Sequence, residues 1–180
     1  MTRTLTGESG TEQAVVGLAE ERQSRYYGKY RGIVQDVEDP DDRGRIVVKV
    51  PEVYGDTDSP WASPSVPFAG DSHGLVVLPE EDDGVWVEFE AGDPCRPIWT
   101  GCWWAGDEMP ESASPRRRVL ATTAGHRVVL DEDAGEIRLV HGDGPEFTMT
   151  GSEIKLKVGS SQIVISDGGV NINNGALEVR

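Results

Sequence analysis

The sequence is poor in basic residues. Its 17 Lys and Arg stand against 32 Asp and Glu, so the formal net charge is −15 at neutral pH. A chain of this charge is repelled at long range by nucleic acids and by anionic lipid surfaces. The charge balance therefore argues against a function by electrostatic adhesion to either surface.

Long apolar runs are also missing. No run approaches the roughly eighteen residues of a membrane-spanning helix, and the segment MTRTLTGESG at 1–10 lacks the apolar centre of a signal peptide. We therefore expect the chain to be made and folded in the cytoplasm.

Cysteine and histidine are scarce and scattered. Cys95 and Cys102 lie on one segment that is expected to be extended, roughly 23 Å apart, so they cannot form a disulfide within the chain. Reduced, buried thiols are the expectation. The three histidines, His73, His126 and His141, have no metal-ligand spacing. We expect no metal and no cofactor.

The last third of the chain, residues 122–180, consists of short alternating runs. In each run two or three apolar residues at spacing two would share one face of a strand, and turns rich in Gly, Asp and Asn recur about every seven to ten residues. A run this short can bury only a narrow apolar stripe, so the missing partner is predicted to be further copies of the chain. The predicted trimer core comprises Val128, Leu130, Ile137, Leu139, Phe147, Met149, Ile154, Leu156, Val158, Ile163, Ile165, Val170 and Ile172.

Three chains around one axis would bury these stripes inside a triangular β-prism, an intertwined triple-stranded β-helix that forms a stiff needle. Its outer faces would carry Arg138, Lys155, Lys157 and Thr148. A single-chain solenoid and an antiparallel sandwich are the alternatives to this homotrimer.

The first part of the chain predicts a short helix and a small barrel. Residues 11–25 form the expected helix, whose patch at Val15, Val16 and Leu18 would pack on its own domain or dock on a neighbouring hub protein. Residues 26–104 predict about five strands, including GLVVLP at 74–79 as a buried strand, in a barrel of the oligonucleotide/oligosaccharide-binding (OB) type. The predicted domains are 1–25, 26–104, a linker at 105–121, and the needle at 122–180.

Candidate catalytic groups are weak. Paired carboxylates lie in turns expected to be exposed, and the combination of His126, Ser112 and Asp131 could be imagined as a triad, but no GxSxG motif is present. The basic triplet 116–118 is expected to act as an electrostatic clasp between domains or subunits. We expect no enzymatic activity.

Three segments in order carry a family resemblance. They are YGKYRGIVQDVEDPDDRGRIVVKVP at 27–51, GLVVLPEEDDGVWVEFEAGDPCRPIWTG at 74–101 and TTAGHRVVLDEDAGEIRLV at 122–140. Together they resemble baseplate assembly protein V, the central spike of contractile phage tails, and the related valine-glycine-repeat spikes of type VI secretion and extracellular contractile injection systems. The motifs do not distinguish among these machines.

The resemblance implies a homotrimeric spike that is part of a baseplate, with an OB collar under a hub and a β-helix needle leading when the sheath contracts. In such machines a conical tip protein of the proline-alanine-alanine-arginine repeat type caps the needle, and effectors may attach there. The blunt end at Leu177, Val179 and Arg180 is the predicted tip-binding site, because it lacks the metal-binding histidine pair of self-tipped spikes. The alternative function is a trimeric fibre that binds a surface glycan.

Overall fold

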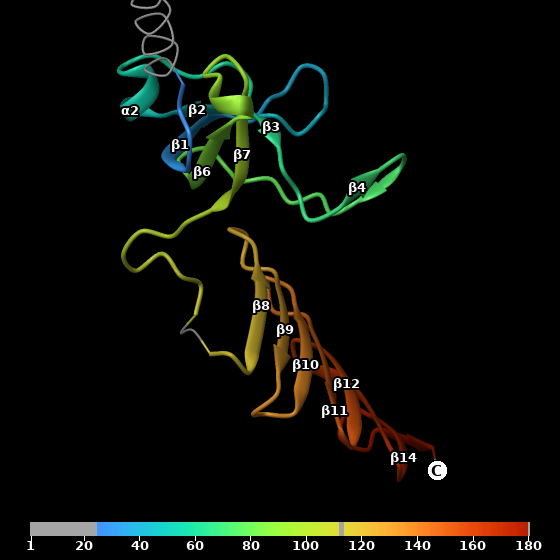
Figure 1. The fold of residues 1–180 in the computed structure, drawn as a ribbon. Helices are drawn as coiled ribbons and strands as arrows, with labels where there is room; N and C mark the ends of the chain where they lie inside the picture. Colours follow the sequence, from blue (N-terminus) through green and yellow to red (C-terminus); the bar gives the residue numbers. More distant parts are fainter. Residues whose placement is uncertain (1–24, 112–113, 180) are drawn as a thin grey trace, which may run out of the picture. The chain divides into compact units, whose positions relative to one another are not determined.

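The computed structural model describes residues 25–111 and 114–179, and the chain divides into two units, residues 1–107 and 108–180. Apart from the short helices α2 and η1, the regular secondary structure of both units is β-strand, which confirms the predicted all-β class (Figure 1). Most of the expected helix at 11–25, with Val15, Val16 and Leu18, lies outside the described residues. Among the described residues, no helix has the length and apolar character needed to cross a membrane.

The first unit contains a five-stranded sheet in the order β2-β1-β6-β7-β3. The strand β1 pairs antiparallel with β2 and β6, β6 pairs antiparallel with β7, and β7 runs parallel to β3. A separate two-stranded hairpin is formed by β4 and β5. The elements are β1 (Tyr30–Asp36), β2 (Val47–Lys49), α2 (Pro51–Tyr54), β3 (Ser63–Pro64), β4 (Ala69–Gly70), β5 (His73–Gly74), β6 (Gly84–Phe89), the 3-10 helix η1 (Glu90–Gly92) and β7 (Pro97–Cys102).

This sheet curls around a closed apolar core. Alternating residues of β1, β2 and β6 point inward, as the period of a strand requires. Trp99 adds its ring to the core and donates its indole N–H to the carbonyl of Gly44, at 3.1 Å. The buried core residues are Val34, Ile46, Val48, Val50, Ala62, Val85, Val87, Phe89 and Trp99.

The turn between β1 and β2 is organised by Asp39. Its carboxylate accepts hydrogen bonds from the backbone N–H groups of Asp41, Arg43 and Arg45, at 2.9 to 3.1 Å, and also from the Arg45 guanidinium. The carboxylate is only 4% exposed. Arg45 therefore holds the pKa of Asp39 well below its usual range, and the backbone N–H groups lower it further.

Two sequence-based expectations about the first unit are wrong. GLVVLP at 74–79 is not a buried strand, because Leu75, Val76, Val77 and Leu78 are 45%, 83%, 51% and 42% exposed and only Gly74 belongs to a strand. The other strands already fill the core, so an apolar run alone did not identify a buried strand. Cys95 and Cys102 are free as expected, but both are exposed rather than buried.

The second unit is a single eight-stranded antiparallel sheet in which each strand pairs with the next one along the chain. It begins at Arg117, within the range expected to be a linker. Figure 1 shows the strands following one another in chain order. Their bounds are β8 (Arg117–Ala121), β9 (Arg127–Asp131), β10 (Glu136–Val140), β11 (Glu146–Thr150), β12 (Glu153–Val158), β13 (Ser161–Ser166), β14 (Gly169–Ile172) and β15 (Leu177–Val179).

The structure gives the order in which the strands of the second unit pair, which the sequence alone did not. Short turns let each strand fold back on its predecessor, which closes smaller loops than pairing with a distant strand would. The six inner strands, β9 to β14, thus have a neighbour from the same chain on both sides. Other copies must therefore meet these strands through side chains rather than through interleaved backbone hydrogen bonds.

Candidate functional site: an open apolar face

The apolar residues of the second unit form two continuous rows across one face of the sheet. The register aligns them strand by strand: Leu139 lies opposite Val128 and Phe147, and Ile137 lies opposite Leu130 and Met149. Row A comprises Leu120, Val128, Leu139, Phe147, Leu156, Ile163, Ile172 and Leu177. Row B comprises Leu130, Ile137, Met149, Ile154, Ile165 and Val170, and the charged residue Arg118 takes its position on β8.

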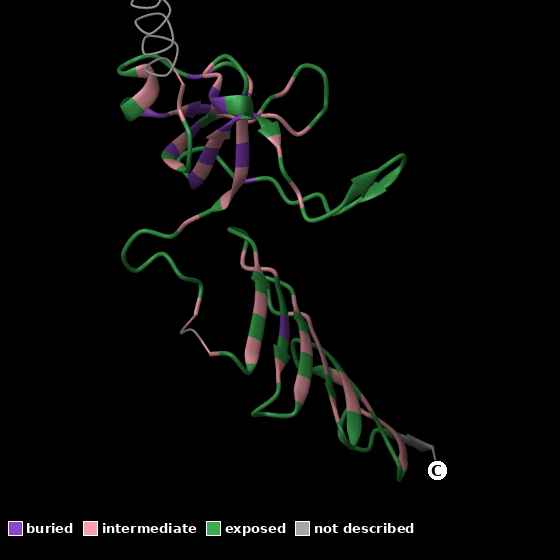
Figure 2. Ribbon diagram, viewed as in Figure 1, coloured by how far each residue is buried: buried purple, intermediate pink, exposed green. Residues whose placement is uncertain are grey.

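These two rows, which we call the apolar face, are open in the single chain. Leu120, Leu139 and Ile165 are 55%, 48% and 44% exposed. In the described part of the second unit only Val129, on the opposite face, is fully buried, as Figure 2 shows for β9. A contiguous apolar surface of this kind on a folded domain marks an interaction site.

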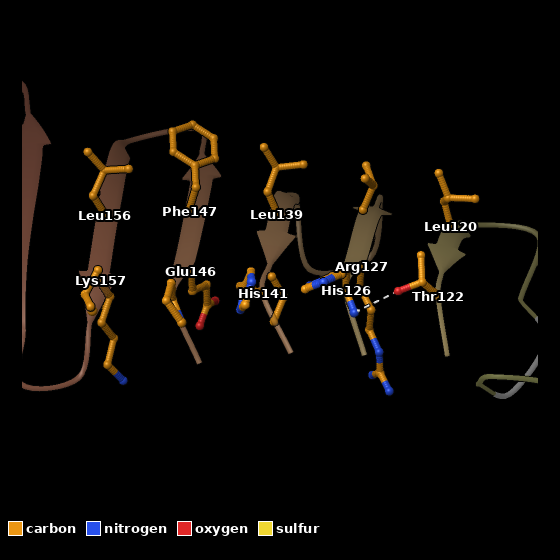
Figure 3. Close-up of a pocket in the computed structure, with 14 residues that line it drawn as sticks. Leu120, Thr122, His126, Arg127, Leu139, His141, Glu146, Phe147, Leu156 and Lys157 are labelled. Carbon is orange, nitrogen blue, oxygen red and sulfur yellow. Dashed lines mark hydrogen bonds between the residues drawn. The ribbon is translucent and has the colours of Figure 1, made fainter. Parts of the chain in front are cut away.

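Part of the apolar face is hollowed. Leu120, Leu139, Phe147 and Leu156 point to the same side of the sheet along a hollow of about 510 Å³ (Figure 3). It lies open along the sheet. Polar and charged residues lie along one side of the hollow, but its exposed surface is mostly apolar. An open apolar hollow of this kind suits the side chains of another protein surface better than a polar small molecule.

Two histidines lie beside row A, with ring centroids 4.3 Å apart. The Nδ1 atom of His126 accepts a hydrogen bond from the backbone N–H of Gly142, at 3.1 Å, and Nδ1 of His141 accepts one from the N–H of Asp143, at 3.2 Å. Each neutral ring then carries its proton on Nε2, so no ring nitrogen is left with a free lone pair. Among the described residues no cluster of three or more potential metal ligands occurs.

The imagined catalytic triad is not assembled. His126 directly precedes β9 and Asp131 ends it, so five residues of extended strand separate them by roughly 16 Å. Asp131 instead accepts hydrogen bonds from the backbone N–H groups of Asp133 and Ala134. Ser112 lies outside the described residues.

The basic triplet forms ion pairs within its own unit, and its expected role as a clasp between domains or subunits stays a prediction. Arg116 pairs with Asp133 and Arg118 pairs with Glu132. Arg117 pairs with Asp131 at 3.2 Å and with Glu111 at 2.8 Å. Hydrogen bonds from the Ala134 and Asp133 backbone and the charge of Arg117 hold the pKa of Asp131 below its ordinary value.

The segment before β8 is tied to the face opposite the apolar face. Glu111 bridges Arg117 of β8 and Arg127 of β9, at 2.8 and 3.1 Å. Arg127 is two positions from Val129 on β9, and Arg117 is two positions from Val119, the residue of β8 that pairs with Val129. Both arginines therefore lie on the same face of the sheet as Val129. This contact anchors the first two strands of the sheet.

All the predicted core residues except Val158 lie in rows A and B. Val158 lies on the same side of β12, one step beyond row A, and is 62% exposed. The sequence prediction missed Leu120, whose alternation with Val119 signals a strand but falls in the range assigned to the linker. Leu177 is 55% exposed, whereas the side chain of Val179 and all of Arg180 lie outside the description.

An OB-type barrel domain followed by a β-sheet with an open apolar face is the domain combination of trimeric baseplate injector proteins, as two family models show. Residues 30–104 match the family model of the type VI secretion system/phage-baseplate injector OB domain. Residues 117–178 match that of the phage baseplate V C-terminal trimerisation domain. The chain belongs to the phage baseplate assembly protein V family, a structural component of the baseplate spike. The predicted family and the predicted OB and trimerising β regions are thereby confirmed.

Proposed function

We propose that three copies of this chain join through their apolar faces into the needle of a central spike, which punctures a target membrane when the surrounding sheath contracts. The observation that carries this proposal is the pair of continuous, open apolar rows, of which row A crosses all eight strands and row B crosses β9 to β14. Burial of a side chain of this size contributes about 1.5–3 kcal/mol when it is complete. Each half-exposed residue thus gains part of that amount only when other copies cover it.

The inferred role is mechanical rather than catalytic. In the second unit the backbone of each inner strand is hydrogen-bonded on both sides within the chain, while side-chain packing would join the copies. Both kinds of contact would have to fail together before an axial load unfolded the needle. Stacked at about 4.8 Å per strand, eight strands give a needle segment on the order of 35–40 Å long.

The remaining partners are proposed from the position of each segment along the chain. The edge strand β15 leaves one row of backbone groups unpaired, and Leu177 on it is exposed. We infer that Leu177, Val179 and Arg180 receive a separate conical tip protein, which can carry effectors. Val15, Val16 and Leu18 are proposed to dock on a separate hub protein, and assembly would take place in the cytoplasm before the spike enters the particle.

Light scattering tests the assembly directly. The full chain should have three times the 19.5 kDa mass of one copy. Leu139→Asp on the apolar face should abolish the trimer, whereas Lys155→Asp on the opposite face should retain it. A stable, folded monomer of the parent chain would contradict the proposal.

The role in the baseplate needs a separate measurement. The trimer should co-purify with the hub and tail-tube proteins of its machine, and ending the chain after Gly175 should remove tip binding while the chain stays trimeric. A trimer that binds neither set of proteins, but binds glycans on an array, would replace the spike role with that of a surface-recognition fibre.

A further inference from the structure

Lys157 and Glu153 lie near opposite ends of β12 and carry opposite charges. They share the face opposite the apolar face, because they are separated by four residues in a strand of period two. That separation corresponds to roughly 13 Å, so the two groups cannot pair within one chain. In the described part of the chain, neither takes part in an ion pair within 4.0 Å.

The neighbouring strands do not neutralise these charges. Lys157 lies opposite Glu146 on the neighbouring strand. The Glu146 carboxylate accepts a hydrogen bond from the hydroxyl of Thr148, at 2.8 Å, and makes no ion pair with Lys157. Glu153 lies opposite Ser166, which has no charge. Each end of β12 thus has one unpaired charge, which is available to a neighbouring chain at that side of the sheet.

The symmetry of a ring determines what lies there. Suppose that three sheets surround an axis with their apolar faces inward and their strands across the axis. The side of one sheet formed by one set of strand ends then meets the opposite side of the next sheet, because a cyclic trimer joins two different patches. Identical strands then meet end to end at about the same height. The end of β12 that carries Lys157 faces the end that carries Glu153 on the neighbouring copy.

We propose that Lys157 of each copy forms an ion pair with Glu153 of the next copy, so that three such pairs close the outer surface of the ring at the height of β12. This proposal rests on the trimeric needle proposed above and adds to it the direction and register in which the copies meet. Strand β9 also has a basic residue, Arg127, at the strand ends on the Lys157 side and an acidic residue, Asp131, on the Glu153 side. Both are already paired within the chain, with Glu111 and Arg117, so Lys157 and Glu153 carry the contact between copies.

Cysteine cross-linking of the full chain tests the register. In a background of Cys95→Ser and Cys102→Ser, the double variant Glu153→Cys/Lys157→Cys should oxidise to a covalent trimer on a non-reducing denaturing gel. Each single variant should remain monomeric on that gel. The matched control Glu153→Cys/Lys155→Cys moves one thiol from the strand end to its middle and should not form a covalent trimer.

A second measurement keeps the test independent of disulfide geometry. Lys157→Glu should lower the melting temperature of the trimer in low salt, and the exchange Lys157→Glu/Glu153→Lys should restore it. The difference should disappear in 1 M salt, where screening is strong. A native trimeric mass with neither cross-linking nor restoration overturns the register, whereas a monomeric mass for the parent chain overturns the trimeric needle itself.

Discussion

Two adjacent residues of β13 offer the sharpest test of where the second unit obtains its stability. Ile163 lies in row A between Leu156 and Ile172, and Val164 lies on the opposite face between Lys155 and Asn171. In the single chain Ile163 is 37% exposed, and Val164 is more buried than Ile163. Judged from one copy alone, Val164→Ala should therefore cost at least as much stability as Ile163→Ala.

The trimer reverses this ranking. A fully covered Ile→Ala truncation costs about 2–5 kcal/mol, or on the order of 6–15 kcal/mol for three copies that leave cavities around one axis. Val164 gains no cover from the other copies, so Val164→Ala should cost about 1 kcal/mol per chain. The expected result is thus a much weaker trimer for Ile163→Ala and nearly parental behaviour for Val164→Ala.

The assay is urea unfolding at several chain concentrations, followed by circular dichroism and light scattering. The unfolding midpoint of the parent should rise with chain concentration, since association and folding are linked. Ile163→Ala should lower the midpoint at every concentration and shift dissociation to higher chain concentration. A larger effect from Val164→Ala, or midpoints independent of concentration, would refute the reasoning.

Further predictions concern the first unit. Because Arg45 and the turn backbone hold the pKa of Asp39 down, the carboxylate stabilises the fold above its ordinary pKa of 3.8, and this contribution is lost as the pH falls below that value. Asp39→Asn should therefore lower the melting temperature at pH 7, with a difference from the parent that shrinks in calorimetry at progressively lower pH. Gly84→Ala should cost about 1–3 kcal/mol, because its Cβ would lie 2.6 Å from the ring of Trp103, and tryptophan fluorescence should report the displaced ring. Burial raises the pKa of Tyr54 to about 12, so the stability that depends on its neutral hydroxyl should be intact below pH 10 and be lost between pH 10 and 12. Absorbance titration should show a late phenolate phase that Tyr54→Phe removes.

Alternation made the apolar face of the second unit predictable. Ile137 and Leu139, like Ile163 and Ile165, are two positions apart in short runs, and a strand has only two faces. Which residues share a face therefore followed from spacing alone. The pairing order did not, because the same runs could pair with the next strand of their own chain or with another copy.

Burial in the first unit was harder to predict, because it depends on the competition among strands for one core. Val85 and Val87 are fully buried, whereas Val76 and Val77 in an equally apolar run are exposed. The difference lies in the partners: β6 is hydrogen-bonded to β1 and β7, while residues 75–78 belong to no strand. Composition cannot reveal this difference without the long-range pairing.

The two units also differ in what completes them. The first unit buries its core with its own residues, from Val34 on β1 to Trp99 on β7, so its folding is a first-order process that does not depend on chain concentration. The second unit fully buries only Val129 among its described residues and leaves rows A and B open. On the proposed trimer, its packing is completed when three chains associate, so its stability rises with chain concentration. On this proposal the first unit folds within one chain, whereas the second unit becomes a rigid rod only when three chains have associated.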